Sequence, residues 1–137
     1  MSRKEIQDEQ KNSEGDPHLK QERRQRAMLI SQSQMMADIP TADVIIVNPT
    51  HYAVALTLSR LPGEAPVCVA KGVDEIAKAI RSAATEANVP IHSDPPTARA
   101  LYATTDIGEM ITPDHFPAVA AAIRFAEAMR LKARGRV

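Results

Sequence analysis

The sequence predicts an α/β fold, in which a small mixed four-stranded sheet is flanked by helices and preceded by an extended N-terminal helix. Two observations carry this prediction. Short runs of β-branched and apolar residues recur from residue 43 onward, and a segment with helical periodicity lies between the third and the fourth of them. A chain of 137 residues is long enough for one modest core, so we expect a single compact domain.

The N-terminal part of the chain is polar and has few apolar anchors. Asp16-Pro17 combines an N-cap residue with proline at the first helical position, which predicts a helix over residues 17–37. We therefore interpret residues 1–37 as a polar linker and N-terminal helix, and residues 38–137 as the compact domain.

Three strands are expected at residues 43–47, 52–58 and 66–70, because these segments are rich in β-branched and apolar residues. Leu61-Pro62-Gly63-Glu64 has the composition of a turn between the second strand and the third. The first two strands are separated only by Asn48-Pro49-Thr50-His51, so a tight turn should join them.

A strand-helix-strand unit follows. The helix is expected over residues 74–88 and the fourth strand over residues 89–92, so that the third and fourth strands run parallel. Gly72 is interpreted as a turn before the helix. The apolar stripe expected on this helix, at the spacing of one buried face, consists of Ile76, Ala79, Ile80, Ala83 and Ala87.

Two further helices should close the domain. The first is short, from Thr97 to Tyr102, and the second follows the helix-start signal Thr112-Pro113-Asp114. The inner stripe expected on the second helix consists of Phe116, Val119, Ile123 and Ala126.

The charge pattern argues against a nucleic-acid-binding protein, because 17 Lys and Arg balance 17 Asp and Glu. Two basic clusters stand out nevertheless. A solvated helix face or tail is the simpler interpretation of each, and binding to anionic lipid headgroups is the functional alternative. The clusters consist of Lys20, Arg23, Arg24 and Arg26, and of Arg130, Lys132, Arg134 and Arg136.

The sequence offers no cofactor or metal site. His18, His51, His92 and His115 lack the spacing of metal ligands, and no glycine-rich loop precedes Lys71-Gly72-Val73-Asp74. The single cysteine, Cys68, lies between two valines and is interpreted as a small core residue in a reducing compartment. No apolar stretch approaches the roughly 20 residues that span a bilayer.

Asn48-Pro49-Thr50-His51 is the candidate reactive site. The Asn48 side-chain amide can attack the Asn48 carbonyl carbon, close a succinimide ring and expel Pro49 as a new N-terminus. His51 is assigned to proton transfer and Thr50 to shaping the turn. Asn-Pro pairs start turns in a great many proteins, so a purely structural turn is the standing alternative.

Pro95-Pro96 also has two interpretations. It is either a stiff loop that presents a recognition surface or the rigid start of a helix.

Several motifs together give the chain a resemblance to a known family. It resembles the cytoplasmic domain of the FlhB/YscU family, the switch proteins of type III secretion export gates, and leans toward the flagellar branch. Two departures stand out: Ser93-Asp94-Pro95-Pro96-Thr97, where the family usually has a sequence close to Glu-Asn-Pro-Pro-Leu, and Cys68 in place of a β-branched residue. The motifs are Glu14-Gly15-Asp16-Pro17, the segment 42–55 with the Asn-Pro-Thr-His run, Ala65-Pro66-Val67, the segment 69–74, Val89-Pro90-Ile91, Pro95-Pro96, the segment 98–102, and Asp106-Ile107-Gly108.

The resemblance implies a function. Self-cleavage between Asn48 and Pro49 would be a single-turnover event rather than enzyme activity, and it would accompany a change of export class from rod and hook to filament components. The implied partners are other export-gate components, a secreted hook-length control protein and the exported substrates. The implied location is the cytoplasmic face of the bacterial inner membrane, after membrane helices that precede this segment. The alternatives are a non-cleaving protein-interaction module and the equivalent domain of a virulence injectisome.

Overall fold

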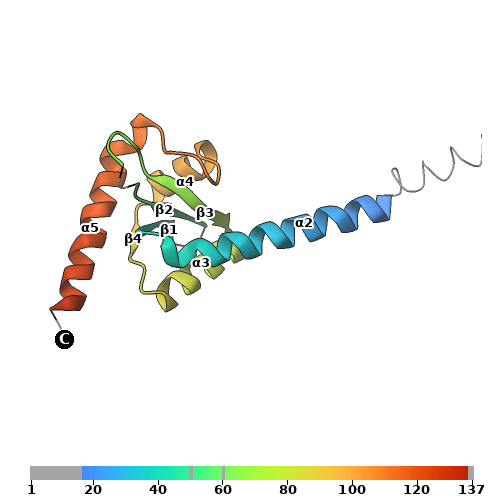
Figure 1. Ribbon diagram of the computed structural model, residues 1–137, viewed down its shortest axis with the longest axis horizontal. Helices are drawn as coiled ribbons and strands as arrows, with labels where there is room; N and C mark the ends of the chain where they lie inside the picture. The colour runs from blue at the N-terminus through green and yellow to red at the C-terminus, as the bar shows by residue number, and fades with distance from the viewer. Residues whose placement is uncertain (1–16, 50, 60, 136–137) are drawn as a thin grey trace, which may run out of the picture. The chain divides into compact units, whose positions relative to one another are not determined.

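The computed structural model describes residues 17–49, 51–59 and 61–135 (Figure 1). It confirms the predicted α/β fold with a mixed four-stranded sheet, flanking helices and an N-terminal helix. The chain divides into two compact units, Met1–Gln34 and Met35–Val137. The elements are α2 (Pro17–Asp38), η1 (Ile39–Thr41), β1 (Val44–Asn48), β2 (Tyr52–Thr57), β3 (Val67–Val73), α3 (Asp74–Glu86), β4 (Ile91–Ser93), α4 (Pro95–Thr104), η2 (Pro113–His115) and α5 (Phe116–Arg134).

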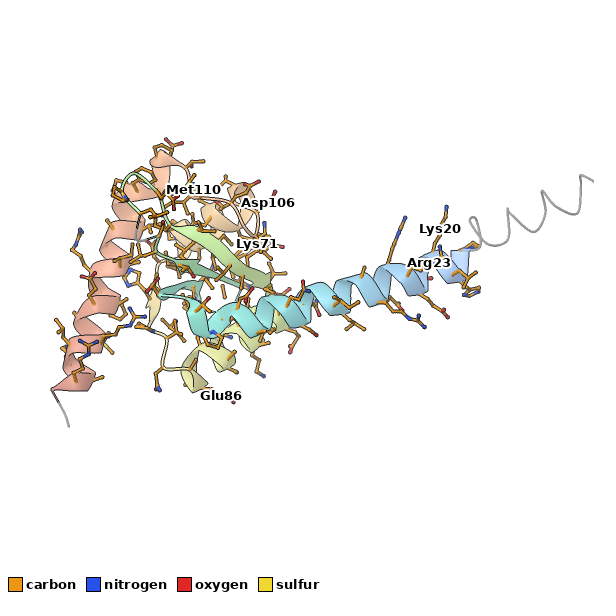
Figure 2. The ribbon with its side chains drawn as sticks, viewed as in Figure 1. Lys20, Arg23, Lys71, Glu86, Asp106 and Met110 are labelled. Atoms are coloured by element: carbon orange, nitrogen blue, oxygen red, sulfur yellow. The ribbon has the colours of Figure 1, made fainter. Side chains whose placement is uncertain are left out.

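The described part of the first unit is one helical segment, residues 17–34 of α2. Its described side chains are exposed, apart from a partly buried Gln32. Figure 2 shows Lys20 and Arg23 projecting from this helix. This arrangement agrees with a solvated helix face for the N-terminal basic cluster. The predicted N-cap Asp16 lies outside the described residues.

The sheet has the strand order β3-β2-β1-β4. β1 pairs antiparallel with β2 and parallel with β4, and β3 pairs antiparallel with β2. β3 and β4 therefore run in the same direction, as predicted, but they occupy opposite edges of the sheet. The strand-helix-strand unit spans the sheet instead of forming a neighbouring pair, because the β1–β2 hairpin fills the space between its two strands.

The core lies on both faces of the sheet, and β1 contributes to both. Ile45 and Val47 point to the face covered by α3, and Val44 and Ile46 to the face covered by α4 and α5. A strand buried on both faces has a continuous apolar run instead of an alternating one. This explains the sequence Val44-Ile45-Ile46-Val47 and makes β1 the most completely buried strand of the domain.

The boundaries of several elements differ from the prediction. β3 extends to Val73, so Gly72 lies inside a strand and not in a turn. A Cβ atom at Gly72 would stand 2.8 Å from Cβ of Ile76, so glycine is needed where the first turn of α3 packs on β3. The turn at 61–64 is confirmed: the Glu64 N–H donates to the Leu61 carbonyl at 3.3 Å, and Gly63 has φ +80°.

The predicted stripe on α3 is partly wrong. Ala79 is exposed, and the buried residues are Ala77, Ile80 and Ala84. Alanines occupy both faces of this helix, so their spacing does not distinguish the buried face from its neighbour. The remaining predicted residues, Ile76, Ala83 and Ala87, are only partly buried at the margin of the core.

The prediction for α5 also needs one correction. Phe116 is 43% exposed, whereas Val119, Ala122 and Ala126 are buried and Ile123 is partly buried. The 3₁₀ turn of η2 precedes the helix, so α5 begins at Phe116. Phe116 therefore lies at the helix end and borders a groove instead of entering the core.

α4 begins at Pro95, two residues before the predicted start. Asp94 is its N-cap: the Asp94 side chain accepts from the Thr97 N–H at 3.3 Å and from the Thr97 hydroxyl at 2.7 Å. Pro95 and Pro96 form the first turn of the helix, where their missing N–H groups cost nothing. Of the two interpretations of the double proline, the structure favours the rigid helix start.

Candidate functional site

The Asn-Pro motif forms the turn of the β1–β2 hairpin. Asn48 is the last residue of β1 and pairs with Tyr52, the first residue of β2. The His51 N–H donates to the Asn48 carbonyl at 2.9 Å and closes the turn. This bond polarises the carbonyl whose carbon the predicted cyclisation would attack. Thr50 lies outside the described residues.

The residue before the turn is held by the sheet and by the start of α4. Val47 pairs with Ser93 of β4, and its carbonyl accepts from the Asp94 N–H at 2.9 Å. Asn48 itself is half-buried. The backbone that leads to Asn48 is therefore held by β2 on one side and by β4 on the other.

Helix α3 meets the turn at two positions that the sequence prediction did not include. The first is Asp74, whose N–H donates to the His51 carbonyl at 3.0 Å and whose Oδ1 lies 3.9 Å from His51 Nδ1. Both side chains are largely exposed, so the ion pair that forms when His51 is protonated contributes little stability. Asp74 has φ +48°, a backbone conformation that costs free energy for a residue other than glycine.

The second position is Arg81, two helical turns further along α3. Its guanidinium donates to the Pro49 carbonyl. The turn is thus bonded to α3 through both Pro49 and His51. The sequence indicates Asp74 only as the start of a helix, not as a residue that contacts the turn. It gives no indication of the contact made by Arg81, which lies 32 residues from Pro49.

A hollow of about 410 Å³ opens beside the turn, and its lining includes Arg99 of α4. His51, Asp74 and Arg99 are exposed, so water reaches the site. The lining residues are Asn48, His51, Tyr52, Val73, Asp74 and Arg99. The lining of the hollow therefore includes the carboxamide of Asn48, the imidazole of His51 and the carboxylate of Asp74.

Lys71 of β3 links its strand to α4 and, through the Tyr102 ring, to the start of β2. Its Nζ donates to the Tyr102 carbonyl at 3.0 Å and to Asp106 Oδ1 at 3.3 Å, and it lies 4.9 Å from the centre of the Tyr102 ring. Figure 2 shows Lys71 and Asp106 close to each other. The Tyr102 ring packs 5.2 Å from that of Tyr52, the residue after His51. β3, α4 and the start of β2 are joined at this point.

Cys68 plays no part in the site. It is buried in the core on the α4 and α5 face, and its Sγ lies 3.5 Å from the Ala70 carbonyl. Burial raises the pKa of its thiol from 9.0 to about 11, against a smaller opposing effect of Lys71. The thiol stays protonated at neutral pH, in agreement with a core residue and not a nucleophile.

The other predicted candidates have structural surroundings. The His92 ring packs 5.0 Å from Phe125, and His115 Nε2 lies 3.3 Å from the Thr104 hydroxyl. Within the described ranges, no three His, Cys, Asp or Glu side chains come together as metal ligands would. No helix in the described part of the chain combines the length and apolar character needed to cross a membrane.

α5 contributes to two surface features, a basic C-terminal end and an apolar groove. At its C-terminal end Arg130 donates to the Asp43 carbonyl at 2.8 Å, and Lys132 and Arg134 are exposed, while Arg136 lies outside the described residues. An apolar groove of about 380 Å³ lies toward its N-terminal end. Its lining residues are Leu58, Gly63, Glu64, Ala65, Pro66, Ile111, Phe116, Val119, Ala120 and Ile123.

Comparison with known proteins identifies the fold and the family. The FlhB HrpN YscU SpaS family matches residues 1–126. Flagellar biosynthetic protein FlhB of Escherichia coli (strain K12) is 49% identical over 120 residues, which are 88% of this chain and 31% of that protein. The chain thus spans about a third of the length of the curated relatives it matches.

Two solved structures extend the comparison. The cytoplasmic domain of FlhB from Shewanella putrefaciens has a TM-score of 0.71 and 45% identity, covering 77% of this chain and 81% of that one. An EscU C-terminal domain with an asparagine-to-alanine substitution has a TM-score of 0.64 and 34% identity, covering 67% and 92%.

A four-stranded mixed sheet with an Asn-Pro hairpin at its rim thus defines a domain of the FlhB and EscU C-terminal type. The chain belongs to the FlhB HrpN YscU SpaS family, which confirms the family predicted from its motifs.

Proposed function

We propose that this chain is the cytoplasmic domain of a flagellar type III export protein that cleaves itself between Asn48 and Pro49. We further propose that the cut permits the change of export class from rod and hook to filament components. The observation that carries the proposal is the hairpin turn, in which Asn48 is held by the sheet, Pro49 supplies the leaving nitrogen and the Asn48 carbonyl is polarised by the His51 N–H. Family membership supports the role in export.

The reaction balances without a cofactor. A bond forms between Asn48 Nδ2 and the Asn48 carbonyl carbon, and the bond from that carbon to the Pro49 nitrogen breaks. Nδ2 loses a proton and the Pro49 nitrogen gains one, so the products are a C-terminal succinimide and a secondary amine. The His51 N–H stabilises the oxyanion of the tetrahedral intermediate, and the His51 imidazole carries the proton. Each chain reacts once, which distinguishes the process from enzyme catalysis.

The fragments are expected to remain together after the cut. The N-terminal fragment contributes β1, which lies between β2 and β4 of the C-terminal fragment, and it contributes Met35 and Ile39 to the core. The four buried residues 44–47 would have to leave the core before the fragments could part. The cut therefore alters the surface near Pro49 and leaves the body of the domain unchanged.

The proposed partners follow from the family. They are other export-gate components, a secreted hook-length control protein and the exported substrates, with an anionic membrane surface as a further candidate. The balanced charge argues against nucleic acid as a partner. The proposed location is the cytoplasmic face of the bacterial inner membrane. The standing alternatives are a non-cleaving interaction module and the corresponding domain of a virulence injectisome.

Mass spectrometry of the denatured protein tests cleavage. We expect one fragment that ends at Asn48 and another that begins at Pro49, and both should be absent from the Asn48→Ala variant. A wild-type chain that stays intact for days at neutral to mildly alkaline pH would refute self-cleavage.

A cellular test addresses the switch. Cells in which the only copy of this protein carries Asn48→Ala should continue to export hook-type proteins and fail to export filament protein. Normal filament export in those cells would separate the cut from the change in export class. Slower cleavage in His51→Ala, with the fold intact, is the result expected from its proton-transfer role.

A further inference from the structure

The bond from Arg81 to the Pro49 carbonyl controls a specific torsion in the reactive turn. In a four-residue turn, the carbonyl of the second residue belongs to the central peptide, and its direction distinguishes one turn type from another. In the turn 48–51 that residue is Pro49, and the guanidinium of Arg81 donates to its oxygen. A side chain of α3 therefore fixes the direction of the Pro49 carbonyl.

The proline ring transmits this constraint to the scissile amide. The ring locks φ of Pro49, so ψ is the only soft backbone torsion between the Pro49 nitrogen and the Pro49 oxygen. Once Arg81 holds the oxygen, ψ is fixed as well. The leaving nitrogen is then positioned relative to α3 with no free rotation in between.

The two halves of the scissile bond thus have separate supports. The Asn48 side is held by the pairing with Tyr52 and by the bond from the Asp94 N–H to the Val47 carbonyl. The Pro49 side is held by Arg81. Reactions between groups within one chain depend steeply on such alignment, because small displacements of the reacting atoms lower the rate by large factors.

We infer that Arg81 is a positioning residue for self-cleavage, acting through its bond to the Pro49 carbonyl and not by touching the atoms that react. This inference rests on the proposed cleavage at Asn48. Arg81 is half-buried, so the variant that tests it must keep the length of the side chain and remove only the hydrogen-bond donor.

Arg81→Met meets this requirement, because methionine is unbranched and favours helices. The full chain is synthesised in a cell-free reaction, synthesis is stopped, and the intact fraction is followed by mass spectrometry under denaturing conditions. We expect Arg81→Met to lower the rate constant about 10- to 100-fold, and Arg81→Lys, which keeps a donor, to recover part of the loss. Low-millimolar guanidinium should accelerate Arg81→Met and leave the wild type unchanged.

Lys78→Met is the matched control. It removes a cation from the same helix one turn earlier, from an exposed side chain, and its rate should equal that of the wild type. Equal slowing of both variants would overturn the inference in favour of a general charge effect. A rate for Arg81→Met within about twofold of the wild type would overturn it directly.

A second measurement separates positioning from folding. Urea unfolding of Asn48→Ala and of Asn48→Ala/Arg81→Met compares two uncleavable chains, and we expect nearly equal midpoints. A loss of rate matched by an equal loss of folded fraction overturns the inference, because Arg81 would then act on the fold. A wild-type chain that is never cut refutes the proposed function itself, whereas a cut wild type with an equally cut Arg81→Met refutes only the role of Arg81.

Discussion

Residues 44–47 of β1 and the turn that follows at 48–51 are close in sequence but differ in burial and in the interactions that hold them. Residues 44–47 are buried on both faces of the sheet, whereas Pro49 and His51 are exposed and held by polar contacts. Apolar burial fixes the first segment, and the second is fixed by the bonds from Asp74 and Arg81. On the proposed function, the contrast explains how one domain can carry a bond that breaks: apolar burial holds the sheet, and a few polar contacts hold the turn.

The largest expected effect comes from a change in the buried segment. Ile45→Ala should lower the free energy of unfolding by about 2–5 kcal/mol, because Ile45 is fully buried against the α3 face of the core. Urea denaturation in an Asn48→Ala background, which keeps the chain intact, measures this loss. A change below about 1 kcal/mol would contradict the idea that β1 anchors the domain.

Gly72→Ala tests the contact that brings α3 up to the turn. The added Cβ would lie 2.8 Å from Cβ of Ile76, so α3 must shift, at a cost of about 1–3 kcal/mol. The same shift should move Asp74 and Arg81 relative to the turn and slow cleavage. The measurements are the unfolding midpoint in the Asn48→Ala background and the cleavage rate in the otherwise wild-type chain.

Gly135→Ala is the control for that substitution. Gly135 has φ −70°, which alanine adopts readily, and the nearest atom to an added Cβ lies 3.5 Å away. It should leave both the unfolding midpoint and the cleavage rate unchanged. Equal behaviour of the two glycine variants would show that α3 does not depend on the close approach at Gly72.

Lys71→Met tests the polar brace on the hairpin. The substitution keeps the stem and removes the bond to the Tyr102 carbonyl, and a loss of about 0.5–1.5 kcal/mol is expected. The pair with Asp106 adds little, since Asp106 is exposed. Lys78→Met should change the free energy of unfolding by less than about 0.5 kcal/mol. If both variants unfold at the same urea concentration, the brace is not stabilising.

The smallest effect concerns Cys68, which reports whether the body of the domain excludes solvent. Its thiol should resist alkylation at about pH 8 in the folded chain and react promptly in urea, because burial raises its pKa to about 11. The folded state holds this proton more tightly than the unfolded state. The thiol's contribution to stability is therefore complete below pH 9.0 and declines as pH rises toward 11. Cys68→Ala should lack this alkaline decline.

The sequence was sufficient for the fold class, the hairpin and the position of the Asn-Pro pair, because these depend on short-range patterns. The β-branched run of β1 and the Asn-Pro pair are local signals. The prediction that Ala79 is buried on α3 is wrong because α3 has alanines on both its buried and its exposed face. The prediction of a turn at Gly72 is wrong because the close packing of a helix on a strand cannot be recognised from composition. Asp74 and Arg81 were missed for a related reason: their bonds to the turn depend on how α3 docks, over separations of 23 and 32 residues.

On the proposed cleavage, the interior position of β1 determines how the two fragments would behave if they separated. An outer strand that detaches exposes the hydrogen-bonding edge of one neighbour, but loss of β1 would expose β2 and β4 together. Unprotected edges recruit strands from other molecules, so a free fragment 49–137 should be prone to aggregation. On the proposed cleavage, the position of β1 in the sheet therefore predicts that the associated fragments aggregate less readily than fragment 49–137 alone.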